Sequence, residues 1–275
     1  MLPKWKLLLL VLPLFLAACY ENNLACLDPD ATNYDLLGDD PCPDDCCQYP
    51  NLSLDVDRFW EDNVLVSTDT FTDGAANEFR LLRFRFYLGD ILLLAGDEAL
   101  PVPENLVEVD LISGTDTVLT EINANVALVN SSGSTSSTVG RLRTGISALT
   151  QVQATLGLAA QYTAVYPPTA PASSPLATQE GILNFNDGQG YLQASVEYLL
   201  TATNDTIRVD VLGNQPLLLD FPTAEVPTRG ANVTVEIEAD YARVFRQINL
   251  TESETVVATS LANALPDLLV ITGVR

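Results

Sequence analysis

The residue types best suited to chemistry in this 275-residue chain are thiols and carboxylates, and they gather near the N-terminus. Residues 26–50 hold four of the five cysteines and a dense run of aspartates. The chain has no histidine, and both lysines and the one methionine lie within its first six residues. The usual general base, the Schiff-base amine and the softest uncharged metal ligands are therefore absent from the rest of the chain.

Four thiols in an oxidising compartment predict two disulfides among Cys26, Cys42, Cys46 and Cys47. A bridge between the adjacent Cys46 and Cys47 would be strained, so we do not expect it. Cys26 then pairs with either Cys46 or Cys47, Cys42 takes the other, and both pairings remain open. A segment this short buries little apolar area, so crosslinks should matter to its folding.

The aspartates of the same segment supply closely spaced oxygen ligands of the type that calcium uses: Asp28, Asp30, Asn33 and Asp35. The EF-hand pattern is not met, because Gly and Glu do not fall at the required places. Asp and Asn side chains also cap turns and solvate spacers, and this is the preferred interpretation. Calcium is the alternative, and no other cofactor is expected.

The N-terminus has the features of an export signal. Residues 1–18 combine two early lysines, an apolar run over 7–16 and small residues before Cys19. The sequence LAAC over residues 16–19 resembles the lipobox of bacterial lipoproteins. That resemblance implies lipidation of Cys19, a tether over residues 19–25 and an outer-membrane lipoprotein of a Gram-negative bacterium, facing the periplasm or the surface. The alternative is an ordinary signal peptide whose Cys19 joins a disulfide.

The charge of the chain limits its partners. Past residue 18 it carries eleven arginines against 36 carboxylates, a net charge of −25. Such a field repels nucleic acid and anionic lipid. We therefore expect no nucleic-acid partner, attachment to the membrane only through a lipid anchor, and an exported protein or a small molecule as ligand.

Residues 51–275 are predicted to form one all-β domain. Apolar and polar residues alternate with the period of half-buried strands over residues 52–57, 106–111, 207–211 and 233–238. Many short strands without alternating helices favour an antiparallel β-sandwich, preceded by the small disulfide-stapled module of residues 26–50. The Gly, Ser and Thr run over 130–140 predicts a loop, and residues 256–265 predict a short helix.

Two segments resemble known families. The spacing of Cys26, the following Asp-Pro, the Asn33-Tyr34 pair and Cys47 resembles a short repeat common in exported bacterial proteins. The sequence FRFYLGDILL over residues 84–93, followed by a proline-rich loop ending in Leu176, resembles the MbnP-like domain. This family of exported β-sandwich proteins is related to bacterial copper-binding proteins of the MopE/CorA kind.

The resemblance to the MbnP-like domain lacks the residues that would bind copper. The family's copper-binding relatives use histidines and an oxidised tryptophan, but Ser174 stands where histidine is usual, and Asn184 and Phe185 lie where tryptophan is expected. The glycine and tyrosine that follow are matched by Gly190 and Tyr191. Copper binding is therefore not expected. Ser174, Asn184, Phe185 and Tyr191 remain as the candidate binding loop, without a named ligand.

Two function classes follow. The first is a noncatalytic, membrane-anchored binding or accessory protein that uses the loops of residues 162–190 as its recognition surface. The second is a carboxylate-dependent hydrolase acting on glycans, which would need two carboxyl groups about 5 to 10 Å apart in a cleft with aromatic side chains. A Ser-His-Asp triad is impossible without histidine, and no spacing singles out a pair of carboxylates. The noncatalytic class is therefore preferred.

Overall fold

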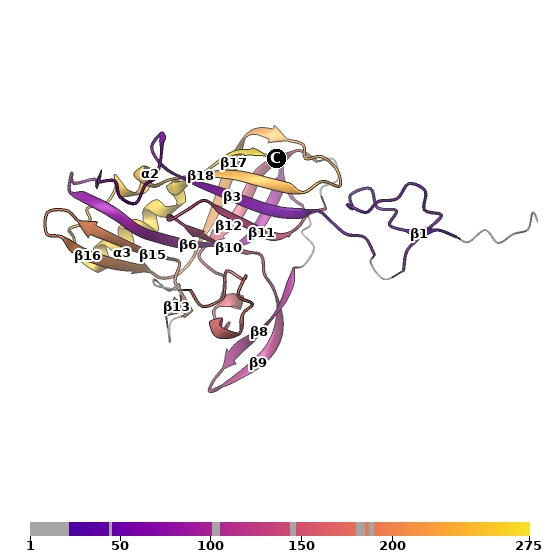
Figure 1. Ribbon diagram of the computed structural model, residues 1–275, viewed down its shortest axis with the longest axis horizontal. Helices are drawn as coiled ribbons and strands as arrows, with labels where there is room; N and C mark the ends of the chain where they lie inside the picture. The colour runs from indigo at the N-terminus through magenta and orange to yellow at the C-terminus, as the bar shows by residue number, and fades with distance from the viewer. Residues whose placement is uncertain (1–21, 44–45, 101–104, 144–146, 180–184, 187–189) are drawn as a thin grey trace, which may run out of the picture.

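A computed structural model describes residues 22–43, 46–100, 105–143, 147–179, 185–186 and 190–275. The signal segment, Cys19 and Asn184 lie outside these residues. Two β-sheets pack face to face and form the main body, as Figure 1 shows. The prediction of an all-β sandwich is confirmed.

The larger sheet has eight strands and is organised around β6 (Glu78–Ala95), which runs along its whole length. Its main path is β16 (Asp205–Val211), β15 (Ala194–Leu200), β6, β12 (Leu149–Leu156) and β17 (Gln215–Glu225). Three shorter strands also pair with β6: β5 (Phe71–Thr72), β7 (Glu98–Ala99) and β10 (Val126–Asn130). Every pairing in this sheet is antiparallel.

The smaller sheet has five strands. Its order is β11 (Thr135–Arg141), β3 (Asn51–Trp60), β18 (Val233–Asp240) and β19 (Leu269–Val274), with β4 (Asn63–Val64) paired to β3. β3 and β18 are parallel, with Val235 opposite Leu54, which departs from the purely antiparallel expectation. A parallel pair needs a long crossover, and here the whole larger sheet is built between the two strands.

Alternation along the strands fills the space between the sheets. Leu52, Leu54 and Val56 of β3 are buried as predicted, and Phe84 and Phe86 of β6 are fully buried. Helix α2 (Tyr241–Phe245) adds two aromatic rings that pack edge-on against Phe84. Helix α3 (Glu254–Ala264) confirms the helix predicted near the C-terminus.

The predicted loop at 130–140 is wrong in its second half. Residues 131–134 form a turn, but Thr135–Arg141 is strand β11, paired antiparallel with β3. This segment is rich in Ser, Thr and Gly because it lies at the edge of the smaller sheet, where alternate side chains face water and little apolar alternation remains.

Several short elements complete the structure. A hairpin of β8 (Leu106–Ser113) and β9 (Asp116–Asn123) projects from the body, below it in Figure 1. The remaining elements are β1 (Leu24–Ala25), β2 (Asp40–Pro41), β13 (Phe185–Asn186), β14 (Gly190–Tyr191) and the 3-10 turns η1 (Ala160–Tyr162), η2 (Pro167–Thr169) and η3 (Leu265–Leu268). No helix in the described parts of the chain is long and apolar enough to cross a membrane.

Candidate functional site

The proline-rich loop packs on a small apolar cluster of its own, separate from the main core. Tyr87 of β6, Tyr162 of η1 and Tyr191 of β14 lie in this cluster with Leu158 and Leu176, and all five side chains are nearly or fully buried. Tyr87 lies on the opposite face of β6 from Phe84 and Phe86, so it faces the loops instead of the main core. One long strand therefore positions both the main core and this loop cluster.

Two tyrosine hydroxyl groups hold the loop by its backbone. The Tyr87 hydroxyl donates to the Pro175 carbonyl at 3.0 Å, and the Tyr191 hydroxyl donates to the Leu176 carbonyl at 2.7 Å. The two rings pack edge to face, with centroids 5.6 Å apart. Ser174 turns inward on the loop itself, and its hydroxyl accepts a hydrogen bond from the Leu176 N–H. The segment 174–176 is thus fixed by its own side chains and by β6 and β14.

The electrostatics of the cluster favour neutral phenols. Burial raises the pKa of Tyr191, and burial with the neighbouring Tyr191 raises the pKa of Tyr87 well above its ordinary value. Burial likewise raises the pKa of Tyr162, whose hydroxyl donates to the Asn123 carbonyl at 2.9 Å. Each phenol therefore acts as a hydrogen-bond donor to a backbone carbonyl at physiological pH.

Of the four predicted loop residues, the structure brings Ser174 and Tyr191 to this cluster. Phe185 is placed only through its backbone, which pairs with Tyr191 between β13 and β14. Asn184 lies outside the described residues. Tyr87 and Tyr162 were not predicted as part of the site. The available signal was FRFYLGDILL itself, in which Tyr87 falls on the opposite face of the strand from Phe84 and Phe86.

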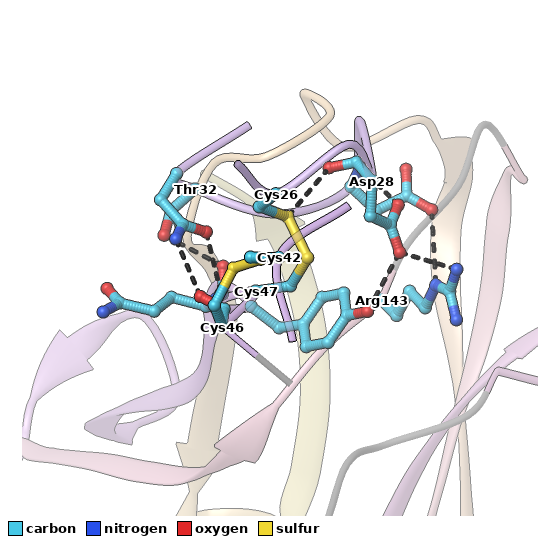
Figure 2. Close-up of a disulfide and its surroundings, with 11 residues drawn as sticks. Cys26, Asp28, Thr32, Cys42, Cys46, Cys47 and Arg143 are labelled. Atoms are coloured by element: carbon cyan, nitrogen blue, oxygen red, sulfur yellow. Dashed lines mark hydrogen bonds and ion pairs between the residues drawn. A yellow bond between two sulfur atoms is a disulfide. The ribbon is translucent and has the colours of Figure 1, made fainter. Parts of the chain in front are cut away.

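The N-terminal module is crosslinked by two disulfides, Cys26–Cys47 and Cys42–Cys46. This is one of the two pairings that the sequence left open. The Cα atoms of the two pairs lie 5.1 and 6.0 Å apart. Figure 2 shows the two bridges close together, with Thr32 beside them. Of the potential metal ligands in the described segments, only Cys42, Cys46 and Cys47 group within 4.8 Å, and disulfides already use these sulfur atoms.

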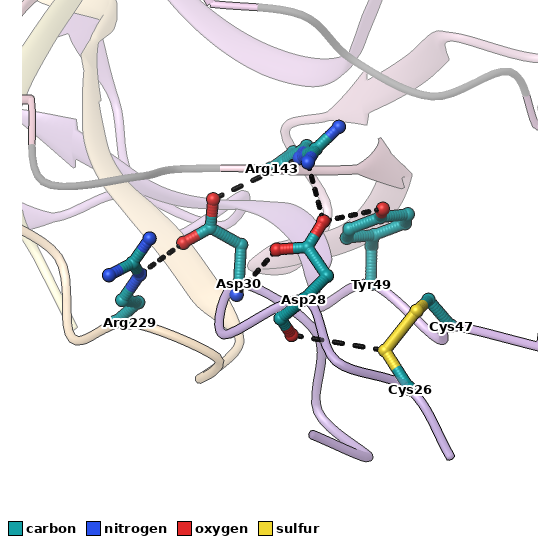
Figure 3. Close-up of polar contacts among 7 residues, drawn as sticks. All are labelled: Cys26, Asp28, Asp30, Cys47, Tyr49, Arg143 and Arg229. Atoms are coloured by element: carbon teal, nitrogen blue, oxygen red, sulfur yellow. Dashed lines mark hydrogen bonds and ion pairs between the residues drawn. A yellow bond between two sulfur atoms is a disulfide. The ribbon is translucent and has the colours of Figure 1, made fainter. Parts of the chain in front are cut away.

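Two of the predicted calcium ligands, Asp28 and Asp30, form ion pairs with arginines of the sandwich domain. Asp28 Oδ2 lies 2.6 Å from Arg143, and Asp30 forms an ion pair with Arg229. Figure 3 shows Asp30 between the two arginines and Asp28 beside Arg143, with the Tyr49 hydroxyl donating to Asp28. Burial raises the pKa of Asp28, but the Asp30 N–H, the Tyr49 hydroxyl and the arginine charges outweigh it and hold this pKa below its ordinary value.

The other two predicted calcium ligands stabilise turns within the module. Asn33 accepts a hydrogen bond from the Gln48 N–H and donates to the Cys46 carbonyl, and Asp35 accepts from the Leu37 N–H. These contacts fit the turn-capping interpretation. Calcium binding by Asp28, Asp30, Asn33 and Asp35 stays a prediction.

Close approach of the module to the sandwich depends on a glycine. Gly230, beside Arg229, has a φ of +69°, and a Cβ atom there would lie 3.1 Å from the Ala31 carbonyl oxygen. A larger residue would strain the backbone and push the two segments apart. The Arg229–Asp30 ion pair and the glycine therefore act at the same junction.

A family model described as MbnP matches residues 49–260. The chain belongs to the MbnP family. The match begins just before β3 and ends within α3, so it covers every strand of the sandwich except β19 (Leu269–Val274) and leaves out most of the crosslinked module.

Among solved structures, the chain is similar to MbnP from Methylosinus trichosporium. The two share 12% sequence identity, the match covers 74% of this chain and 79% of that one, and the TM-score is 0.47. No curated protein sequence matches the chain.

Two surface pockets of this MbnP family member could be considered as the site of a glycan hydrolase. A pocket of about 560 Å³ between β17, α2 and β19 includes Asp220 and Asp267 but no aromatic ring. A pocket of about 490 Å³ beside β4 includes the rings of Trp60 and Phe71 but a single carboxylate, Asp69. Neither pocket combines paired carboxylates with aromatic side chains, so neither has the composition expected of a glycan hydrolase site.

Proposed function

We propose that this MbnP family member is a noncatalytic binding or accessory lipoprotein, attached to the outer membrane through Cys19, whose loop cluster does not bind copper. Its ligand in this proposal is an exported protein or a small molecule. The observation that carries the proposal is the loop segment 174–176, which is held by tyrosine hydroxyl groups at the place where relatives are expected to carry a copper-binding histidine.

The chemistry of the available donors supports the absence of copper. Imidazole and thiolate suit copper, whereas this cluster offers phenols, one serine hydroxyl and backbone carbonyls. The phenols stay protonated because burial raises their pKa values, and their protons are directed at carbonyl oxygens. The residues present therefore do not fit a copper ion, and the chain has no histidine elsewhere to supply one.

Copper titration of the full chain, followed by electron paramagnetic resonance, tests this part of the proposal. We expect only the weak, unsaturable signal of copper(II) on surface carboxylates. Ser174→His adds an imidazole where relatives have one, and Ser173→His adds it one residue away as a matched control. A saturable one-to-one copper signal in the unaltered chain would contradict the proposal, whatever the two variants do.

The lipid anchor needs a separate test, because Cys19 lies outside the described residues. Lipidation of the cysteine after LAA would place acyl chains next to the tether of residues 19–25, and each buried methylene contributes about 0.8 kcal/mol to membrane binding. Metabolic labelling with a palmitate analogue should label the unaltered protein and not Cys19→Ala. Equal labelling of both proteins would rule out the anchor.

A further inference from the structure

The projecting hairpin of β8 and β9 has one covered edge and one open edge. Segment 164–169 lies along β8: the Ile112 N–H donates to the Ala164 carbonyl at 2.6 Å, and the Tyr166 N–H donates to the Asp110 carbonyl at 2.8 Å. Leu111 and Val165 form an isolated antiparallel bridge at the same edge. The β8 edge is therefore already used within the protein.

The register shows which groups the other edge presents. The Asp110 carbonyl and the Ile112 N–H point away from β9 and bond to segment 164–169. Their partners on β9, Leu119 and Thr117, therefore belong to the pairs that exchange no hydrogen bonds within the hairpin. The same alternation includes Glu121. The N–H and C=O groups of these three β9 residues point away from β8, and they have no backbone partner among the residues that the structure describes.

Apolar side chains flank this open edge. Leu119 is 66% exposed and Val118 is 54% exposed, on opposite faces of β9, and Ile112 lies diagonally across from Leu119 at 40% exposure. The other face of the hairpin carries Val109, which is buried in the loop cluster and holds the hairpin in place. A strand added to β9 would thus cover aliphatic surface on both of its faces.

The hairpin is uniformly acidic. It carries Glu108, Asp110, Asp116 and Glu121 and no basic residue, and no ion pair to these four side chains is found in the described part of the chain. Strand β16, at the end of the larger sheet, differs, because Arg208 pairs with Asp210 there at 2.9 Å. A second copy of this acidic hairpin would be repelled, whereas a cationic segment would be attracted.

We propose that the open edge of β9 binds an extended peptide segment of a partner protein in which basic and aliphatic residues alternate. The peptide backbone would pair with Thr117, Leu119 and Glu121, as in other cases of strand addition to a sheet edge. Its basic side chains would face Glu121 and Asp110, and its aliphatic side chains would cover Val118 on the other face. This surface is distinct from segment 174–176, so the proposal holds whether or not that segment binds copper.

The test uses the full chain and a labelled synthetic peptide of alternating lysine and valine, followed by fluorescence anisotropy. We expect saturable one-to-one binding. The same peptide with N-methylated backbone amides keeps its charge and side chains and should bind at least about tenfold more weakly, because it cannot donate the backbone hydrogen bonds of a strand. A peptide of alternating glutamate and valine should not bind.

Two substitutions locate the binding site. Leu119→Pro removes an outward N–H that the hairpin does not use, which edge strands tolerate, and should weaken binding at least about tenfold more than the matched Leu119→Ala. Glu121→Arg should weaken binding, while Asp205→Arg on β16 should have little effect. Amide hydrogen exchange on the unaltered protein gives a readout that needs no variant: the amides of Thr117, Leu119 and Glu121 should gain protection when the peptide binds.

The outcomes separate strand addition from simple charge attraction. Equal binding of the N-methylated peptide, equal binding to the Glu121 and Asp205 variants, or unchanged exchange at the three β9 amides would each overturn the proposal. Absence of saturable binding by the lysine–valine peptide would overturn it as well.

Discussion

The sandwich core and the N-terminal module are held together by different forces. Between the sheets, Phe79, Phe84 and Phe245 are fully buried, and the Phe245 ring packs against Phe79 and Phe84 at centroid distances of 5.0 and 5.9 Å. In the module, Leu36 and Leu37 are 78% and 80% exposed, and the buried side chains include Cys26 and Asp30. The module relies on two disulfides and on ion pairs to the domain behind it.

The difference shows how chain length limits the means of folding. The sandwich has enough residues to enclose apolar side chains from two sheets, so burial can stabilise it. The module spans about two dozen residues and cannot enclose a core, so covalent loops must restrict its unfolded state. Reducing agents and salt should therefore lower the stability of the module, whereas substitutions that leave a cavity in the core should lower the stability of the sandwich.

The largest expected effect is at the centre of the sandwich. Phe84→Ala removes a fully buried ring that contacts Phe86, Tyr241 and Phe245, and should lower the free energy of unfolding by about 3 to 5 kcal/mol. Chemical denaturation followed by tryptophan fluorescence measures this, because Trp60 lies in the same core. A loss below about 1 kcal/mol would mean that the ring is not packed as described.

The next largest effect is expected from loss of the Cys26–Cys47 disulfide, which closes the longer of the two loops. Replacing Cys26 and Cys47 together by serine opens a loop with a sequence separation of 21, which should destabilise the module by about 3 kcal/mol. Limited proteolysis should then cleave residues 22–50 rapidly, while the unfolding midpoint of the sandwich stays within a few degrees of its original value. A large fall in that midpoint would show that the two regions fold as one unit.

A smaller effect is expected from a buried hydroxyl group of the main core. The Tyr198 hydroxyl donates to the Leu250 carbonyl at 2.9 Å, so Tyr198→Phe should lower the free energy of unfolding by about 1 kcal/mol.

The same tyrosine gives the core a dependence on alkaline pH. Burial, with the charges of Asp73 and Glu254, raises the pKa of Tyr198 to about 12. A raised pKa in the folded state favours the neutral phenol, so its contribution is complete below about pH 10 and is lost as pH rises toward 12. Denaturation curves between pH 8 and 12 should show a smaller loss for Tyr198→Phe than for the unaltered protein, and an equal loss would contradict this assignment.

The smallest effect is expected at the junction of module and sandwich. Arg143 and Arg229 are each about half exposed, so solvent weakens their ion pairs. Arg229→Gln should therefore destabilise the packing of the module on the sandwich by only about 0.2 to 1 kcal/mol. The pKa of Asp28 is lowered in the folded protein, so its contribution is present above the ordinary pKa near 4 and is lost as pH falls below it. Proteolysis of the tether and module should therefore speed up in acid with pepsin, and less so in Asp28→Asn.

The sequence predicted the elements that depend on local pattern. Alternation identified β3, β16 and β18 because each has one buried and one more exposed face, and it identified β8, in which Val109 is the buried residue. It missed β11, since an edge strand of Ser, Thr and Gly carries little apolar alternation.

Contacts between distant residues could not be predicted in the same way. The parallel pairing of β3 with β18 joins segments that no local pattern connects. Arg229 lies 199 residues from Asp30, so nothing near either residue indicated that they would meet. The loop and Tyr191 were identified by the resemblance to a family, but Tyr87 of β6, which also holds the loop, and Tyr162 of η1, which joins the cluster, were recognised only through the fold.

Elemental analysis tests most directly the central claim that this MbnP sandwich has exchanged copper ligands for a loop held by tyrosines. The full chain would be isolated from membranes of cells grown with added copper, and its copper content measured by mass spectrometry after exhaustive dialysis. The account predicts far less than one copper ion per chain. One firmly held copper ion per unaltered chain would contradict the claim, whether or not Ser174→Ala and Tyr191→Phe retain that ion.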